Sequence, residues 1–369
     1  MPLPMNWDIS GVLKLQFYRG LNPSHIRHIV ESYSSYDEFI HAELPPELNL
    51  IINQGELFRR GIKKPDVEAE KQIEKCENFG VKIITFWDSR YPDSLKQIHH
   101  PPTVIYTKGH LRESSTDCLA IVGTRRCSTY GRLNSERFSD YFSKRGIIIV
   151  SGLARGIDTF AHNVAKANNG NTYAVVASGL DKISPHYSNK NAEEIIDLGG
   201  AIISIFPCSI AAKPPYFLQR NRIISGLSKA TLVIESRFKG GALNTARFAR
   251  DQDREVFALP GNISSEQSEG TNDLIKRGLA QLASSPENLY KELSFENSIN
   301  FTINDVQEIV FNDNDEKEIY DKIGFEPLHV DEISRITNME IQQLLVTLLN
   351  LEFSGVIRQL PGKYYVRQN

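Results

Sequence analysis

The sequence predicts an α/β protein whose core is a doubly wound, mostly parallel sheet, with a small N-terminal helical domain and a C-terminal winged-helix domain. Between residues 81 and 293, short apolar runs alternate with longer amphipathic stretches. The apolar runs contain few polar residues, which is typical of strands whose two faces are both covered by helices. After residue 315 the pattern changes to three helical stretches and a hairpin, which is typical of a winged helix.

Residues 1–80 are predicted to form a helical module. The turn Gly20–Ser24 precedes a helical run, and further helical runs cover Asp37–Ala42 and Asp66–Phe79. The Gly-x-x-Pro turn between two short helices is similar to the turn of a SAM- or helix-hairpin-helix-like module, and the latter motif holds DNA backbone through its turn amides. The alternative is a helical domain with a purely packing role.

Residues 81–293 are predicted to form an extended Rossmann-like domain. Two early apolar runs, Val81–Phe86 and Thr103–Tyr106, are expected to extend its sheet. The clearest strand candidates are Leu119–Val122, Ile147–Val150, Tyr173–Ala177, Ala201–Ile205, Thr231–Ile234 and Val256–Leu259.

Residues 294–314 are rich in Asn and Asp and are predicted to be a linker to the winged-helix domain, residues 315–369. Its expected elements are the helices Glu316–Ile323, Val330–Ile336 and Met339–Glu352 and a hairpin of Gly355–Leu360 and Lys363–Val366. The domain holds six Lys+Arg against nine Asp+Glu, and its third helix has no cation. A sequence-specific helix in the major groove needs such cations. We therefore expect this domain to dock a protein or to tune oligomerisation.

Charge and composition limit the class of protein. The net charge is −3, but residues 118–260 carry 19 Lys+Arg against 11 Asp+Glu, while the rest of the chain carries 23 against 34. The middle of the chain is therefore basic, as in proteins that bind nucleic acid. We expect a cytoplasmic protein without a membrane segment, because no leader pattern or long apolar run occurs. The four cysteines are far apart in sequence and indicate neither a disulfide framework nor a zinc site.

The loops that follow the predicted strands carry the candidate site, because ligands of open parallel sheets bind at the carboxyl ends of strands. These loops combine glycine, which lets the backbone approach a phosphate, with arginine and lysine. The run Phe217–Arg222, expected as a loop entering a helix at Ile223–Ser228, adds a ring suited to stacking on a base. Tight turns also use glycine for geometry alone, so the cations carry the prediction. The candidate nucleic-acid-binding residues are Gly123, Arg125, Arg126, Gly152, Arg155, Phe217, Arg220, Asn221, Arg222, Lys239, Gly241 and Thr245.

An ordered set of motifs resembles the DprA (Smf) family, the DNA-processing proteins of natural transformation. The motifs are Ile121–Arg125, Tyr130-Gly131, Ser151–Asp158 with His162, Arg220–Leu227, Gly241–Ala246 and Ala258–Gly261. The resemblance implies a protein without a catalytic activity, cofactor or metal. It further implies binding and protection of single-stranded DNA, transfer of the strand to the RecA recombinase, and a homodimer formed through the Rossmann-like domain.

By the same resemblance, Arg125, Gly152 and Arg220-Asn221-Arg222 line a phosphate-gripping pocket, with Lys239 nearby. The sequence departs from the family's pattern at three motifs, one of which is the usual Tyr-Pro before an Asn, replaced here by Ser184–Asn189. Ser204–Ser209 keeps only Phe206-Pro207 of one family motif, and Gly240 replaces the usual Ser before Gly241.

The alternative prediction is a nucleotide-binding enzyme of the nucleoside-monophosphate hydrolase type. Such hydrolases carry a glycine-rich loop that ends in a glutamate, and the analogous position here is Phe248. Glu235 and Asp158 remain as single carboxylates. Asp158 and His162, four residues apart on a predicted helix, are a candidate metal or acid–base pair, or else a helix-capping carboxylate and a packed histidine.

Overall fold

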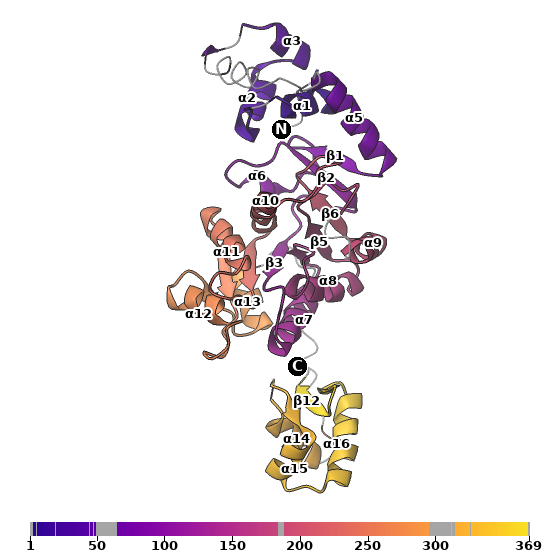
Figure 1. The fold of residues 1–369 in the computed structure, drawn as a ribbon, viewed down its shortest axis with the longest axis vertical. Helices are drawn as coiled ribbons and strands as arrows, with labels where there is room; N and C mark the ends of the chain where they lie inside the picture. The colour runs from indigo at the N-terminus through magenta and orange to yellow at the C-terminus, as the bar shows by residue number, and fades with distance from the viewer. Residues whose placement is uncertain are drawn as a thin grey trace.

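The structure is a computed structural model. It describes residues 3–48, 65–183, 188–294 and 311–367, with residues 5, 19, 44, 47, 312, 313 and 325 left out. The predicted linker lies mostly outside the described residues. The fold class is confirmed: helices at the N-terminus precede a mostly parallel sheet, and a winged helix follows it (Figure 1).

The N-terminal helices are α1 (Ile9–Gln16), α2 (Pro23–Ser32), α3 (Tyr36–His41) and α5 (Pro65–Asn78). The second begins at the predicted turn, where the side chain of Asn22 accepts a hydrogen bond from the amide of His25 and caps the helix. Apolar side chains of these helices share one buried cluster with residues of the sheet, including Tyr106 and Ile202. The helical module and the sheet are therefore joined by a continuous core.

The central sheet has nine strands in the order β1-β2-β6-β5-β4-β3-β7-β8-β9. The strands from β6 to β9 in this order are parallel. β1 and β2 extend the sheet, as expected for the two early apolar runs, and they pair in the antiparallel direction. The strands are β1 (Lys82–Thr85), β2 (Val104–Gly109), β3 (Cys118–Val122), β4 (Ile148–Ser151), β5 (Thr172–Val175), β6 (Ala201–Ser204), β7 (Ala230–Val233), β8 (Glu255–Ala258) and β9 (Gln281–Leu282).

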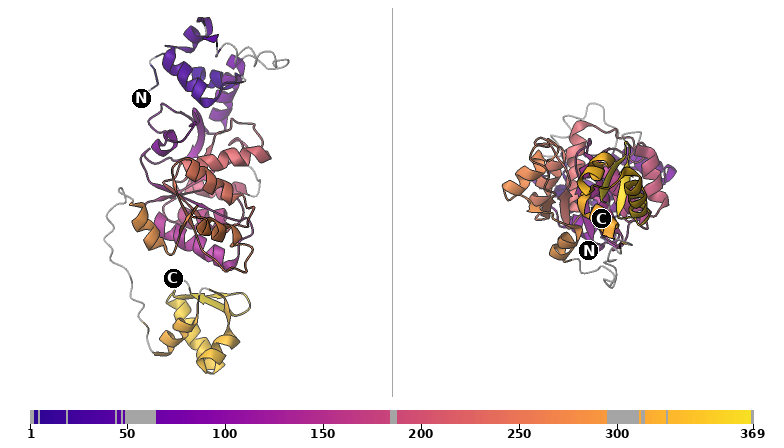
Figure 2. Two further views of the ribbon diagram at one scale, coloured as in Figure 1. Left: turned by 90° about the vertical axis from the view of Figure 1, so that its left-hand side faces the viewer. Right: turned by 90° about the horizontal axis from the view of Figure 1, so that it is seen from below.

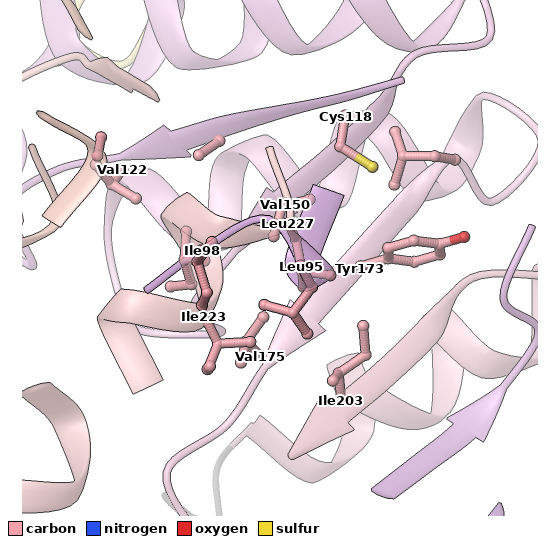
Figure 3. Close-up of a cluster of buried hydrophobic side chains, with 14 of the residues drawn as sticks. Leu95, Ile98, Cys118, Val122, Val150, Tyr173, Val175, Ile203, Ile223 and Leu227 are labelled. Atoms are coloured by element: carbon pink, nitrogen blue, oxygen red, sulfur yellow. The ribbon is translucent and has the colours of Figure 1, made fainter. Parts of the chain in front are cut away.

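Helices cover both faces of this sheet. On β3, Leu119 and Ile121 point into one buried cluster, while Cys118 and Val122 point into another, which Figure 3 shows in close-up. Because both faces are buried, these strands have no polar alternation, which is the pattern seen in the sequence. The first face is covered by α7 (Thr129–Ser143), α8 (Ile157–Ala167), α9 (Asn189–Asp197) and α13 (Pro286–Leu293), and the second by α6 (Asp93–Lys96), α10 (Pro214–Gly226), α11 (Ala242–Asp251) and α12 (Glu269–Lys276).

The C-terminal unit, drawn in orange-yellow to yellow in Figure 2, has its own apolar core. This core includes Ile319, Ile333 and Leu348. Three helices and a three-stranded antiparallel sheet form a winged helix, as predicted. Its elements are α14 (Asn314–Lys322), β10 (Leu328–His329), α15 (Val330–Thr337), α16 (Ile341–Phe353), β11 (Ile357–Leu360) and β12 (Tyr364–Arg367).

Candidate functional site

The winding of the sheet opens a pocket at its carboxyl edge. From β3 the chain proceeds outward through β4 and β5 to β6, and then returns to place β7 on the other side of β3. The loops after β3 and β7 therefore diverge, which is the arrangement at which open α/β sheets bind ligands. A pocket of about 450 Å³ lies there, lined by these loops, by the start of α8 and by the first half of α10.

The structure brings most of the predicted site residues together and leaves four outside. The predicted residues that line the pocket are Gly123, Arg125, Phe217, Arg220, Asn221, Lys239, Gly241 and Thr245. Arg126, Gly152, Arg155 and Arg222 are not among its lining residues. Arg126 and Arg155 are exposed in the loops after β3 and β4.

Arg222 is separated from the pocket because Phe217–Arg222 is helical rather than a loop. Helix α10 starts at Pro214, nine residues before the helix start expected from the sequence. Arg222 points away from the pocket and donates from Nη1 to the carbonyl oxygens of His99 and His100, at 2.9 Å each. These bonds give Arg222 a structural role in holding the turn between α6 and β2.

The guanidinium of Arg220 is buried at the pocket wall. The residue is 5% exposed, and its Nε atom is buried without a hydrogen-bond partner among the described residues. Burial lowers the pKa of Arg220, and the carboxylate of Asp158 acts in the opposite direction. A buried cation with an unsatisfied donor is costly unless an anion approaches it. An anion in the pocket would offset the cost of burying this guanidinium.

Gly152 makes room for this guanidinium. A Cβ built on Gly152 would lie 1.3 Å from Nη1 of Arg220 and 2.8 Å from Oδ2 of Asp158. The predicted role of Gly152 was close approach to a phosphate. In the structure, the guanidinium of Arg220 instead occupies the space next to Gly152, so a residue with a side chain does not fit there.

The ring of Phe217 lies between two arginines. The guanidinium carbon of Arg125 is 5.7 Å from the ring centroid, and that of Arg220 is 5.9 Å from it. Cation–π contacts of this kind hold guanidinium groups in position while leaving their N–H donors available. Arg125 is exposed at the pocket mouth, so the three side chains run from the mouth to the buried wall.

Several lining residues were not among the predicted nucleic-acid-binding residues. Arg237, Asn244 and Leu218 line the pocket together with Asp158. Arg237 also forms an ion pair with Glu266, with 2.9 Å between Nη2 and Oε2. Arg237 and Asn244 belong to the same loop-to-helix segment as Lys239 and Gly241. The basic, glycine-rich composition of this segment is the sequence signal that could have identified them.

Asp158 and His162 stabilise the loop after β4. Asp158 Oδ2 accepts from the amides of Gly152 at 3.1 Å and Ala154 at 3.4 Å, while burial raises its pKa. The amide of Leu153 donates to Nε2 of His162 at 3.3 Å, which assigns the ring proton to Nδ1, 2.7 Å from Thr172 Oγ1. Burial lowers the pKa of His162 to about 3. Both ring nitrogens are therefore occupied, which favours the packed histidine over the acid–base pair.

Glu235 is also occupied by the fold. It is 1% exposed, and its carboxylate accepts from the amide of Ser128 at 2.9 Å and from the Ser128 hydroxyl. Ser128 in turn caps α7 by accepting from the amide of Gly131. The carboxylate therefore fixes the start of α7 rather than facing the pocket.

No group of three or more His, Cys, Asp or Glu side chains could hold a metal ion in the part of the chain that the structure describes. None of the described helices is long and apolar enough to cross a membrane.

Comparisons with known proteins identify relatives along most of the chain. A family model described as DNA recombination-mediator protein A matches residues 82–294, and one described as the DprA winged helix domain matches residues 311–363. Protein Smf of Escherichia coli (strain K12) is 37% identical over 348 residues, which cover 92% of this chain and 90% of that protein.

Two solved structures resemble the fold. DNA processing protein A (DprA) from Streptococcus pneumoniae has a TM-score of 0.61 and 30% identity, covering 79% of this chain and 100% of that one. A structure of DNA processing protein A from Helicobacter pylori, described for its single-stranded DNA binding mode, has a TM-score of 0.52 and 27% identity. It covers 58% of this chain and 95% of that one.

Proposed function

Because this chain belongs to the DprA/Smf family of DNA-processing proteins, we propose that it binds single-stranded DNA through the pocket at the switch point of its sheet. The buried guanidinium of Arg220, whose Nε lacks a partner among the described residues, is the observation that carries this proposal. A phosphate is the anion that matches it, because guanidinium and phosphate form strong charge-assisted hydrogen bonds. The single-stranded DNA binding mode described for the Helicobacter pylori relative supports the same ligand.

The charge of the pocket supports a polyanionic ligand. Its lining cations are Arg125, Arg220, Arg237 and Lys239, and its lining carboxylate is Asp158. Arg125 and Lys239 are exposed, so they can follow a backbone that extends beyond the buried arginine. Phe217 and the exposed Leu218 supply apolar surface for bases next to these cations.

The pocket is proposed to bind without breaking a bond in the strand. Its carboxylate, Asp158, accepts two backbone amides, and the neighbouring Glu235 is bound to Ser128. A nucleotide hydrolase needs a free carboxylate or an activated water next to the scissile bond. The hydrolase alternative has no such group among the described residues that line the pocket, and Phe248 stands at its glutamate position.

Family membership supports two further steps of the proposed function. A recombination mediator delivers the bound strand to a recombinase, so we propose RecA as the partner that receives it. We also propose a homodimer through the Rossmann-like domain, which would align two pockets on one strand.

The test is fluorescence anisotropy of a labelled oligonucleotide over a range of salt concentrations, with Arg125→Ala compared with Arg126→Ala. The two arginines are adjacent and exposed, but only Arg125 lines the pocket. Arg125→Ala should weaken single-strand binding about 10-fold and reduce the slope of log K against log salt by about 0.7. Arg126→Ala should change the affinity and the salt slope far less. Equal effects of the two variants would mean that diffuse surface charge, rather than the pocket, binds the strand.

A further inference from the structure

Cys76 and Cys208 are brought into contact by the fold, although 132 residues separate them in sequence. Their sulfur atoms are 3.8 Å apart, and the two residues are 1% and 5% exposed. Cys76 lies near the end of α5, and Cys208 lies in the loop between β6 and α10. From this juxtaposition we infer that Cys76 and Cys208 form an oxidisable dithiol that closes to a disulfide.

The geometry suits this bond. A disulfide needs a sulfur–sulfur distance of about 2.05 Å, so the two sulfurs must approach by roughly 1.8 Å. Rotation of two cysteine side chains and a small adjustment of a loop supply such a movement. Cys208 lies in a loop rather than in a helix or strand, so no regular backbone ladder has to break when its side chain rotates.

Contacts around the pair hold the two thiols opposite one another. Lys75 Nζ donates to Ser209 Oγ at 2.9 Å, which joins the residues next to the two cysteines. Asp181 Oδ1 accepts from the amide of Ser209 at 2.8 Å, and Gln72 Nε2 donates to Cys76 Sγ at 3.4 Å. Both partners are therefore positioned before oxidation, so closing the bond costs little extra conformational entropy.

One of the two sulfurs is the better nucleophile. The hydrogen bond from the Cys76 thiol lowers the pKa of Cys208, against the effects of burial and Asp181. The pKa of Cys76 is raised, first by the hydrogen bond with Cys208. A thiolate is the reactive form of cysteine, so Cys208 reacts first.

The oxidant is a small peroxide, because both sulfurs are nearly buried. The Cys208 thiolate attacks one oxygen of hydrogen peroxide, the O–O bond breaks, and hydroxide leaves and takes up a proton as water. The sulfur of Cys76 then attacks the sulfenic acid on Cys208, its thiol proton joins the departing hydroxyl, and a second water leaves. Two thiols thereby lose two electrons in total, and one peroxide is reduced to two waters.

The disulfide would link the helical module to the loop that leads into the pocket helix. Phe206, two residues before Cys208, contacts Tyr216 in the first turn of α10, with ring centroids 4.5 Å apart. Phe217 and Arg220 follow on the same helix. Oxidation therefore fixes α5 to the segment that positions two pocket residues, while leaving the pocket residues themselves unmodified.

The experiment uses the full chain, fully reduced and then treated with hydrogen peroxide. Denatured samples are labelled with a maleimide reagent that counts free thiols, and tryptic peptides are mapped by mass spectrometry. The number of free thiols in wild type should fall from four to two, and the digest should contain a Cys76–Cys208 cross-linked peptide. The Tm should rise, because the link closes a long loop. Adding a reductant should reverse all three changes.

The matched variants separate this pair from the other thiols. Cys76→Ser and Cys208→Ser should each keep their three thiols free of an intramolecular disulfide and show no rise in Tm. Cys118→Ser and Cys127→Ser remove thiols outside the pair and should still form the cross-link. Four free thiols in oxidised wild type, or a cross-link that involves Cys118 or Cys127, would overturn the inference.

Discussion

The guanidinium of Arg220 occupies the space into which a side chain on Gly152 would extend. A Cβ at position 152 would fall 1.3 Å from Nη1 of Arg220. The glycine at the end of β4 and the arginine in α10 therefore form one unit, although 68 positions separate them in the sequence. The unit places a buried cation at the point where the sheet changes its winding direction.

Gly152→Ala should expel Arg220 from its position and weaken binding of single-stranded DNA. The closest conflict is with the far end of the flexible Arg220 side chain, so the arginine moves while the fold is retained. Oδ2 of Asp158, 2.8 Å from the new Cβ, must also shift slightly, which lowers stability. Losing one guanidinium–phosphate contact costs about 1 to 3 kcal/mol, which weakens binding by roughly one to two orders of magnitude. Anisotropy titrations measure the affinity, and thermal unfolding checks that the variant still folds cooperatively at the assay temperature.

A double-mutant cycle tests whether Gly152 acts through Arg220. In an Arg220→Ala background, Gly152→Ala should weaken binding no further, because the displaced group is already absent. Additive losses in the double variant would show that Gly152 contacts the strand by itself.

Gly123 and Gly241 line the same pocket but should respond differently to alanine. A Cβ on Gly123 would lie 2.5 Å from the side chain of Ile157, which is fully buried, whereas a Cβ on Gly241 meets nothing within 4 Å. Gly123→Ala should therefore lower the free energy of unfolding by about 1 to 3 kcal/mol through overpacking. Gly241→Ala should leave stability nearly unchanged and weaken DNA binding, because the new methyl group projects where a phosphate would approach.

Urea unfolding and anisotropy, performed on both glycine variants, check this separation. A stable Gly241→Ala protein with wild-type affinity would show that no phosphate approaches the backbone at residue 241.

The sheet and its buried faces were predictable from the sequence, because strands such as Cys118–Val122 carry apolar residues on both faces. The start of α10 was not predicted. Its signal was Pro214-Pro215, a pair suited to the first turn of a helix, which the interpretation as a loop did not use.

The helical start also explains the error at Arg222. Successive residues of a helix are rotated by about 100°, so side chains two positions apart, such as Arg220 and Arg222, point in nearly opposite directions. Phe217, Arg220 and Ile224 share the pocket side of α10 at helical spacing. The Cys76–Cys208 contact was not predictable, because it depends on how α5 packs against a loop far away in the sequence.

The stability of the protein should fall in acid partly because of His162. Burial lowers the pKa of its imidazole to about 3, whereas an unfolded histidine titrates near pH 6.5. Between these values the unfolded chain binds a proton that the folded chain does not bind. The free energy of unfolding therefore falls as the pH falls from about 6.5 toward 3, by up to about 1.4 kcal/mol per pH unit.

Urea unfolding of wild type and His162→Asn between pH 4.5 and pH 7.5 isolates this contribution. The free energy of unfolding should depend more steeply on pH in wild type than in the variant, because the variant lacks the titrating imidazole. Burial raises the pKa of Asp158, which stabilises the folded state as the pH falls, but this effect is common to both proteins and cancels in the difference. Parallel curves would mean that the imidazole of His162 is not protected from protonation.

The winged-helix domain should contribute little to the binding of duplex DNA. Its helix α16, in the position of a recognition helix, carries no Lys or Arg, and its exposed side chains include Val346, Leu349 and Phe353, at 61%, 49% and 81% exposure. A helix that enters the major groove needs cations and polar groups for phosphates and base edges. An exposed apolar face instead favours contact with protein.

A chain that ends at residue 294 should therefore bind duplex DNA within about threefold of the full chain at the same salt concentration, because a lost phosphate contact would cost more than this. Its affinity for single strands and its salt slope should also be retained, since the proposed pocket lies within residues 122–245. Anisotropy with matched single- and double-stranded oligonucleotides measures both. A tenfold loss of duplex affinity alone would assign DNA binding to the winged helix. The cations of its hairpin, Arg358, Lys363 and Arg367, would then be the contacts to substitute.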